Sequence, residues 1–221
     1  MKNLLHVALC LVLGVGTAKA QNPEVFKEKG YTLNFLNNDQ SFDPALKKRM
    51  VATFFKVYPV LANAYNKNTA KEVTFSIDTA YKGVAATGGG KIVYNPDWFR
   101  KHPGDIDVVT HEVMHVVQNY GRGGGPGWLT EGIADYVRYK YGVDNAGANW
   151  SLTPFKPEQS YKNAYRITAR FLNYLEKSNP GIVVKLDDAM RTHTYKDTIW
   201  TNLTGKTVDE LWTAYAANPG T

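Results

Sequence analysis

Apolar and polar residues follow two different periods along the chain, one in the first part and another in the second. In residues 72–78, Val73, Phe75 and Ile77 alternate with polar residues, which predicts a strand. Residues 31–37 are a similar run, and residues 91–95 follow a turn made by three consecutive glycines. The early part of the chain is therefore expected to form strands, with residues 21–41 as an otherwise extended lead-in.

Apolar residues recur every three or four positions in the longer segments, which predicts helices. The first helix is expected to begin at Asp43 and Pro44, a capping side chain followed by proline, and to kink or break at Pro59. A helix around His111 and His115 is expected to be capped by Asp105 or Asp107, to end at Gly121 and to be followed by a flexible loop. The segment 96–105 is a turn or short helix, and further helices are expected at residues 128–142, 160–181, 182–191 and 207–218.

No linker divides the chain after residue 20, so residues 21–221 are interpreted as one domain. Strands come early and helices dominate later, which indicates the α+β class.

The first twenty residues have the features of a secretory signal peptide. Lys2 provides the positive charge, residues 4–15 form a short apolar core, and Ala18-Lys19-Ala20 fits a cleavage site. The alternative is an N-terminal membrane anchor, but the apolar run is too short to span a bilayer. We expect cleavage after Ala20 and a secreted or periplasmic protein, and no later stretch is apolar for long enough to cross a membrane.

Removal of this segment changes the charge and the cysteine content. The formal net charge of +6 falls to +4, because Lys2 and Lys19 leave without any acidic residue. Cys10, the only cysteine, leaves as well, so no disulfide is expected. We find no basic run with interleaved aromatic residues, so a nucleic acid is not an expected partner. The protein is expected to be a monomer.

Residues 111–115, His-Glu-Val-Met-His, carry the candidate chemistry. Residues four apart on a helix point nearly the same way, so His111 and His115 can bind one cation. Glu112 lies about 100° round the helix and can act as general base on a metal-activated water. The alternative is a helix that carries two histidines by chance.

A catalytic zinc needs a third protein ligand, and the second helix offers two carboxylates. Glu131 follows His115 by sixteen residues across a glycine-rich turn, and Asp135 lies one helical turn further on. Glu131 can be the third ligand, while Asp135 accepts the free ring N–H of a ligand histidine. The converse, with Asp135 as the ligand, remains open.

The pattern H-E-x-x-H followed by E-x-x-x-D resembles the gluzincins, zinc metallopeptidases with a glutamate ligand, although the spacer here is slightly shorter. It is more similar to the basic secretory protein family, described as peptidases of plants and bacteria. The segments that carry this resemblance are HEVMHVVQ, GRGGGPG and WLTEGIADYVR, with YRITARFLNYLE, LDDAMR and GKTVDELWTAY further on, so that it extends over about residues 31 to 217.

The resemblance implies a zincin-like fold, with a small N-terminal mixed sheet, an active-site helix and a mostly helical C-terminal part. It also implies Zn²⁺ as the cofactor, His111, His115 and Glu131 as its ligands, and Glu112 as the catalytic acid and base. Tyr165 opens one of the family-like segments and is the candidate donor to the oxyanion.

Several assignments around this site stay open. Tyr161 and His193 are the alternatives to Tyr165, which is otherwise an ordinary core or surface tyrosine. Gln118 is a polar face residue or a contact to a ligand, and residues 83–95 are a plain hairpin or a strand that pairs with substrate.

The function predicted first is a secreted zinc-dependent peptidase with a peptide or protein substrate. The alternatives are a secreted defence or binding protein that keeps the fold with little turnover, and a zinc hydrolase that acts on a non-peptide amide, because the motif specifies activated water and not the substrate.

Overall fold

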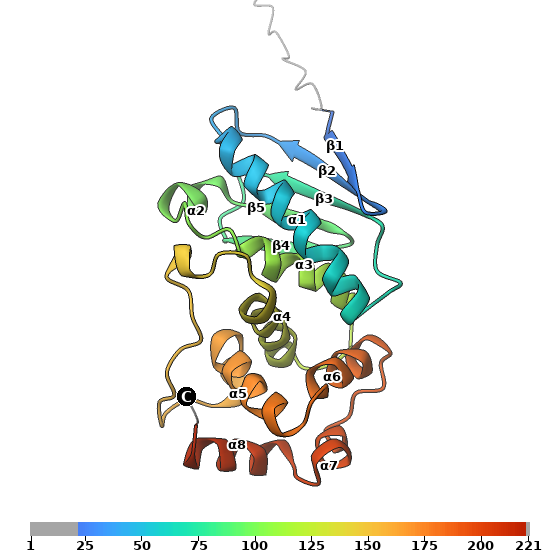
Figure 1. Ribbon diagram of the computed structural model, residues 1–221, viewed down its shortest axis with the longest axis vertical. Coiled ribbons are helices and arrows are strands. Elements are labelled where there is room, and N and C mark those ends of the chain that lie inside the picture. Colours follow the sequence, from blue (N-terminus) through green and yellow to red (C-terminus); the bar gives the residue numbers. More distant parts are fainter. Residues whose placement is uncertain (1–21, 220–221) are drawn as a thin grey trace, which may run out of the picture.

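The computed structural model describes residues 22–219, in which a mixed sheet lies in one half of the molecule and most helices lie in the other (Figure 1). The predicted signal peptide lies outside these described residues. The five strands are β1 (Glu24–Glu28), β2 (Tyr31–Asn37), β3 (Glu72–Ile77), β4 (Ala85–Gly88) and β5 (Lys91–Tyr94). Their order is β1-β2-β3-β5-β4, with parallel pairing in the centre and an antiparallel strand at each edge. This arrangement confirms the α+β class with a small N-terminal mixed sheet.

The sequence pattern predicts strands β2, β3 and β5, whereas β1 lies within the segment expected to be an extended lead-in. Val25 and most of β1 are exposed, so the strand lacks the buried alternating positions that reveal its neighbours. Strand β1 is therefore recognised by its pairing with β2 and not by a pattern of buried side chains.

Helix α1 (Pro44–Ala64) packs over the sheet with Met50, Phe54 and Leu61 fully buried (Figure 1). The side chain of Asp43 caps it by accepting the backbone N–H of Ala45 at 2.8 Å, as expected. Of the expected kink or break at Pro59, the break is wrong.

The helix runs unbroken through Pro59 to Ala64, and the carbonyl that proline leaves without a backbone donor has another partner. Proline cannot donate to the carbonyl four residues earlier, that of Phe55. The Nζ atom of Lys29, in the turn between β1 and β2, donates to this carbonyl at 3.1 Å instead.

Helix α3 (Val108–Gln118) carries both histidines and is buried over almost its whole length. It contacts α1, β4 and β5 as well as α4 (Gly127–Tyr141), and so lies between the edge of the sheet and the helical half. It ends at Asn119 in the left-handed conformation (φ 43°) and not at Gly121, because asparagine tolerates this conformation well enough to end a helix earlier.

The predicted helix over residues 160–181 is divided at its start. A short 3₁₀ turn, η2 (Tyr161–Asn163), precedes α5 (Tyr165–Ser178), and Ala164 between them has a positive φ of 62°. The side chains of Ser160 and Asn163 form a capping box at the start of the 3₁₀ turn, and the non-helical backbone of Ala164 ends it before α5 begins. The remaining helices are α2 (Pro96–Lys101), η1 (Ala146–Ala148), α6 (Ile182–Arg191), α7 (Thr198–Thr204) and α8 (Val208–Ala217).

Helices α4 and α5 pack closely because Gly132 lies against Thr168, where a Cβ atom would collide with the threonine side chain. This close approach holds α5 against α4, and the first residue of α5, Tyr165, stacks on His111 of α3. None of the helices described between residues 22 and 219 is both long and apolar enough to span a membrane.

Asp107 precedes α3 but does not cap it, contrary to expectation, and Asp105 does not cap it either. Asp107 is fully buried and accepts hydrogen bonds from the backbone N–H groups of Val143 and Asp144, at 2.8 and 2.6 Å, and from the hydroxyl of Thr110 at 2.7 Å. It is therefore used to hold the loop after α4 against the start of α3.

Replacement of Asp107 by alanine should leave these three donors without acceptors in the interior. We expect the free energy of unfolding to fall by about 3 kcal/mol, measured by urea denaturation. Glu158→Ala, at an exposed loop position, is the control and should change it by less than about 0.5 kcal/mol. An equally small effect of Asp107→Ala would contradict this role.

Candidate metal and catalytic site

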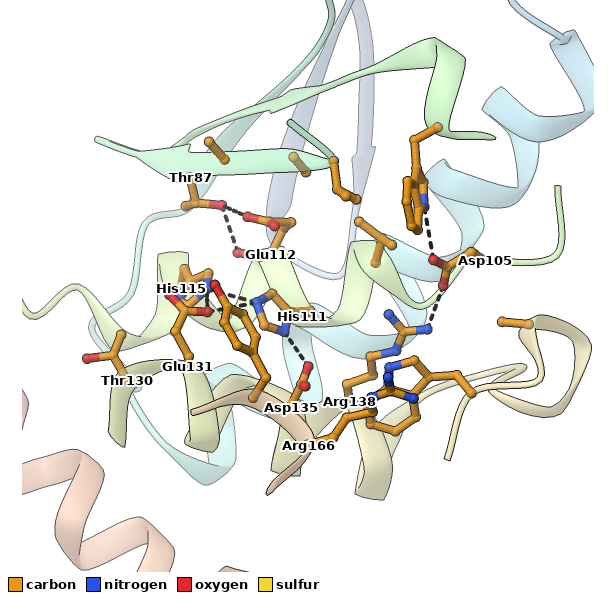
Figure 2. A pocket seen from close by; sticks show the side chains of 18 of the residues that line it. Thr87, Asp105, His111, Glu112, His115, Thr130, Glu131, Asp135, Arg138 and Arg166 are labelled. Atoms are coloured by element: carbon orange, nitrogen blue, oxygen red, sulfur yellow. Dashed lines mark hydrogen bonds and ion pairs between the residues drawn. The ribbon is translucent and has the colours of Figure 1, made fainter. Parts of the chain in front are cut away.

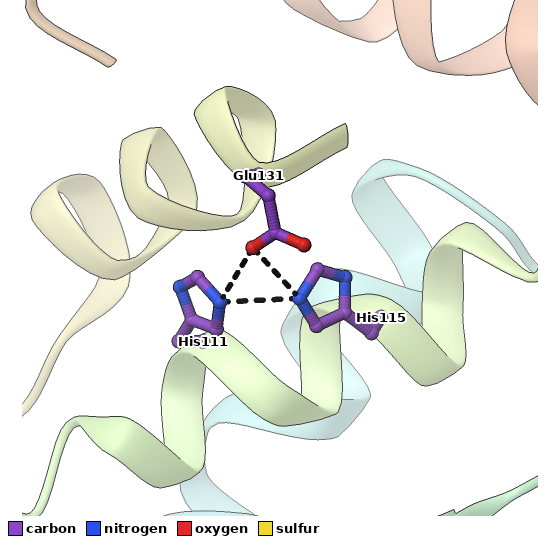
Figure 3. A group of neighbouring side chains, drawn as sticks. All are labelled: His111, His115 and Glu131. Carbon is purple, nitrogen blue, oxygen red and sulfur yellow. Dashed lines mark hydrogen bonds and ion pairs between the residues drawn. The ribbon is translucent and has the colours of Figure 1, made fainter. Parts of the chain in front are cut away.

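Three side chains from two helices converge at the centre of the site (Figure 3). Helix α3 places His111 and His115 one turn apart, and the first turns of α4 bring Glu131 over them. The two Nε2 atoms are 3.1 Å apart, and Oε2 of Glu131 lies 3.3 Å from Nε2 of His111 and 3.5 Å from Nε2 of His115. These three residues could hold a metal ion.

The spacing of the three atoms fits a tetrahedral zinc ion. Ligand atoms bonded to zinc at about 2.0–2.1 Å lie about 3.3–3.4 Å apart when the geometry is tetrahedral. The observed separations of 3.1 to 3.5 Å lie around this value. Two imidazoles and a carboxylate are also a donor set typical of catalytic zinc, which keeps a fourth position open.

Both histidine rings are oriented by acceptors on their other nitrogen. Nδ1 of His111 lies 2.7 Å from Oδ1 of Asp135, and Nδ1 of His115 lies 2.6 Å from Oε1 of Gln118. A carboxylate or amide oxygen can only accept here, so each Nδ1 carries a hydrogen and Nε2 is the nitrogen left to bind a metal ion. Gln118 in turn donates to the carbonyl of Thr130 on α4 at 2.9 Å.

The carboxylates shape the electrostatics of the histidine pair. Burial alone lowers the pKa of His111, but the hydrogen bonds to Asp135 and Glu131 outweigh it and raise the pKa to about 10. Burial raises the pKa of Glu131, and the two histidines more than reverse this, so that the pKa lies well below its usual range. The carboxylates therefore favour positive charge on the histidine pair.

Glu112 lies on the side of α3 that faces the sheet (Figure 2) and lines the same cleft as the three converging side chains. It is buried, and its Oε2 accepts a hydrogen bond of 2.6 Å from the hydroxyl of Thr87 on β4. This hydroxyl also lies 3.2 Å from the backbone carbonyl of Glu112. The edge strand thus fixes the direction of the carboxylate.

A cleft of about 1040 Å³ contains all of these groups. Residues of β4 form one wall, the histidines and Glu112 the floor, and the start of α5 the opposite wall. This volume accommodates several residues of an extended peptide.

Tyr165 enters the cleft from α5. Its ring stacks on that of His111, with centroids 6.2 Å apart and an interplanar angle of 17°, and the residue is 54% exposed. Burial, followed by the charges of Glu131 and Asp135, raises the pKa of Tyr165, so the hydroxyl stays protonated and can donate. The two alternatives lie elsewhere: Tyr161 is buried and donates to Asp209, and His193 does not line the cleft.

The backbone that presents Tyr165 is strained. Ala164 has φ 62° and ψ −172°, a region used almost only by glycine, and Tyr165 follows with φ 49°. Each such residue costs on the order of 1–3 kcal/mol and persists only where its surroundings hold it. Here the hydroxyl of Thr168 donates to the carbonyl of Tyr161 at 2.5 Å and holds the turn closed.

The structure thus brings together all of the sequence-predicted site residues: His111, Glu112, His115, Glu131, Asp135 and Tyr165. It adds Thr87, which no sequence pattern indicated, because its contact with Glu112 spans 25 residues. Gln118 could be recognised only as lying three residues after His115, on the same helical face.

A family model matches most of the chain. Residues 30–215 match the family model described as peptidase of plants and bacteria. No curated protein matches the chain.

Among solved structures, a mutant M1 zinc metallopeptidase from Deinococcus radiodurans is similar in fold, with a TM-score of 0.50 and 12% identity over 91% of this chain and 52% of that one. A mutant two-domain M1 zinc metallopeptidase bound to L-tryptophan gives a TM-score of 0.45 and 16% identity, over 91% of this chain and 48% of that one. The chain therefore spans about half the length of the solved structures it matches.

Proposed function

The chain belongs to the family of peptidases of plants and bacteria, and we propose that it is a secreted, zinc-dependent peptidase that cleaves with a water activated beside Glu112. The observation that carries this proposal is the convergence of His111, His115 and Glu131 at separations suited to one tetrahedral ion. In this proposal Glu131 is the third ligand. Asp135 is not, because its carboxylate is used by Nδ1 of His111.

A zinc ion in this position would supply a Lewis acid that lowers the pKa of a bound water to about 7. Glu112 then takes the proton of the attacking water and passes it to the leaving amine. Thr87 holds the carboxylate in place for this role, and Asp135 and Gln118 keep both histidines in the tautomer that exposes Nε2. The hydroxyl of Tyr165 donates a hydrogen bond to the oxyanion that forms at the carbonyl.

Strand β4 is suited to hold an extended peptide. It forms the edge of the sheet and pairs only with β5 among the strands described in residues 22–219. Ala85, Ala86 and Thr87 line the cleft, so the free edge of β4 borders the histidines and Glu112. A substrate that adds as a further strand here gains backbone hydrogen bonds without regard to its sequence.

The first prediction concerns the general base. Glu112→Gln should keep zinc at the level of the unchanged protein and lower peptide hydrolysis by about 10²–10⁴-fold, because the amide cannot accept a proton. Zinc is measured by elemental analysis and hydrolysis on a peptide library, with and without a chelator. Full activity in this variant would refute the mechanism, and no hydrolysis by the unchanged protein would favour a binding function.

The second prediction separates the ligands from their supports. His115→Ala and Glu131→Ala should lose zinc, whereas Asp135→Ala and Gln118→Ala should retain it with about 10–100-fold weaker affinity. Competition with a zinc chelator of known affinity provides the measurement. If Asp135→Ala loses more zinc than Glu131→Ala, the assignment of the third ligand is wrong.

The third prediction concerns Tyr165. Tyr165→Phe keeps the ring against His111 and removes only the hydroxyl, so kcat should fall by about 10²–10³-fold while zinc affinity and KM stay near those of the unchanged protein. Tyr161→Phe is the matched control, because Tyr161 donates to Asp209 outside the cleft. An unchanged kcat in Tyr165→Phe would remove this residue from the chemistry.

A further inference from the structure

The cleft continues beyond His111 into a second region that the proposed chemistry does not use. Figure 2 shows Asp105, Arg138 and Arg166 on one side of His111, with His115 and Glu131 on the other. The rings of Trp98, His102 and Trp150 also line the cleft. We call these six residues the arginine end of the cleft.

The wall of the arginine end is a fixed network. Nη2 of Arg138 donates to Oδ1 of Asp105 at 2.5 Å, and Nε1 of Trp98 donates to the other carboxylate oxygen at 2.9 Å. The guanidinium of Arg138 lies 4.4 Å from the centroid of the Trp150 ring, and His102 packs on Trp98 with centroids 4.0 Å apart. Arg138 is almost fully buried, so this wall is set before any substrate arrives.

Arg166 differs from Arg138 because its charge is not compensated. It is exposed, lines the cleft and makes no ion pair or hydrogen bond with another described residue. It directly follows Tyr165, so the strained turn that places the tyrosine over His111 also places this guanidinium.

Every carboxylate that lines the cleft is already engaged. Asp105 pairs with Arg138, and Asp135 with His111. Glu131 lies between the two histidines, and Glu112 accepts from Thr87. An ammonium group of a substrate would therefore find no uncommitted carboxylate, whereas an anionic group would find the guanidinium of Arg166.

We propose that the arginine end is a substrate subsite for a carboxylate, with Arg166 as its cation and Trp98 and Trp150 as apolar walls. This inference rests on the proposed peptidase function and names its substrate class: peptides with an acidic side chain, or a free C-terminal carboxylate, near the cleaved bond. Arginine suits this task because its planar fork binds both oxygens of a carboxylate.

The test uses the zinc-loaded protein and a cleaved peptide identified from a library. Matched peptides exchange Glu for Gln at each position around the cleaved bond, and a second set exchanges the C-terminal carboxylate for a carboxamide. We expect kcat/KM to be about tenfold higher for one acidic member, as suits one charge-assisted contact. The set that shows the difference identifies the source of the carboxylate.

Variants then assign the preference to Arg166. In Arg166→Gln the ratio of kcat/KM between the acidic and the neutral peptide should fall to about one, and in Arg166→Glu a lysine peptide should be preferred over its glutamine counterpart. Lys162→Gln is the matched control, since this exposed cation lies four residues away and does not line the cleft, and it should keep the ratio. An unchanged ratio in Arg166→Gln, or no acidic preference in the unchanged protein, would overturn the proposal.

A binding measurement separates failure of the subsite from failure of the proposed function. The same peptide pairs are titrated into zinc-loaded Glu112→Gln, with the fluorescence of the tryptophans as the signal. Tighter binding of the acidic member, lost in the double variant with Arg166→Gln, supports the subsite even if no peptide is cleaved. Equal binding of acidic and neutral peptides overturns it, whether or not hydrolysis is observed.

Discussion

The site depends on the packing of α4 against α3, because neither helix holds a complete set of ligands. Helix α3 offers two imidazoles and a carboxylate, and α4 supplies Glu131 together with Asp135, which orients the ring of His111. Asp135 holds His111 directly, and Gln118 joins His115 to the backbone of Thr130. Polar side chains on a buried helix need partners, so the contacts that orient the site also join the two helices.

A second constraint is the turn before α5, where strain is retained in two consecutive residues. Ala164 and Tyr165 both have positive φ, and the close fit of Gly132 against Thr168 leaves α5 little freedom to relax. One strained turn thus directs two adjacent side chains into the cleft, the tyrosine toward His111 and Arg166 toward the arginine end. A relaxed helix start would change the direction of both.

Local sequence was sufficient where the signal lies within a few residues. The helical spacing of His111, Glu112 and His115 and the cap at Asp43 are of this kind, and both appear in the structure as expected. Prediction from the sequence failed where a residue far away in the chain provides the partner. In α1 the carbonyl that Pro59 leaves without a backbone donor accepts from Lys29, and Asp107 accepts from backbone groups of the loop after α4. The role of Thr87 could not be foreseen for the same reason, because only the fold places β4 against α3.

Thr87 also links substrate binding to the orientation of the general base in the proposed reaction. Its side chain holds the carboxylate of Glu112, and its strand is the free edge to which an extended peptide would pair. The rise of a strand is about 3.3 Å per residue, so a peptide shifted by one residue along β4 would present a different carbonyl to the base. The hydrogen bond from Thr87 fixes the base relative to that strand, and the register of the bound peptide then determines which bond lies beside Glu112. Under this arrangement the backbone hydrogen bonds to β4 do not discriminate between substrate sequences. Selectivity for the substrate then depends on side-chain subsites along the cleft.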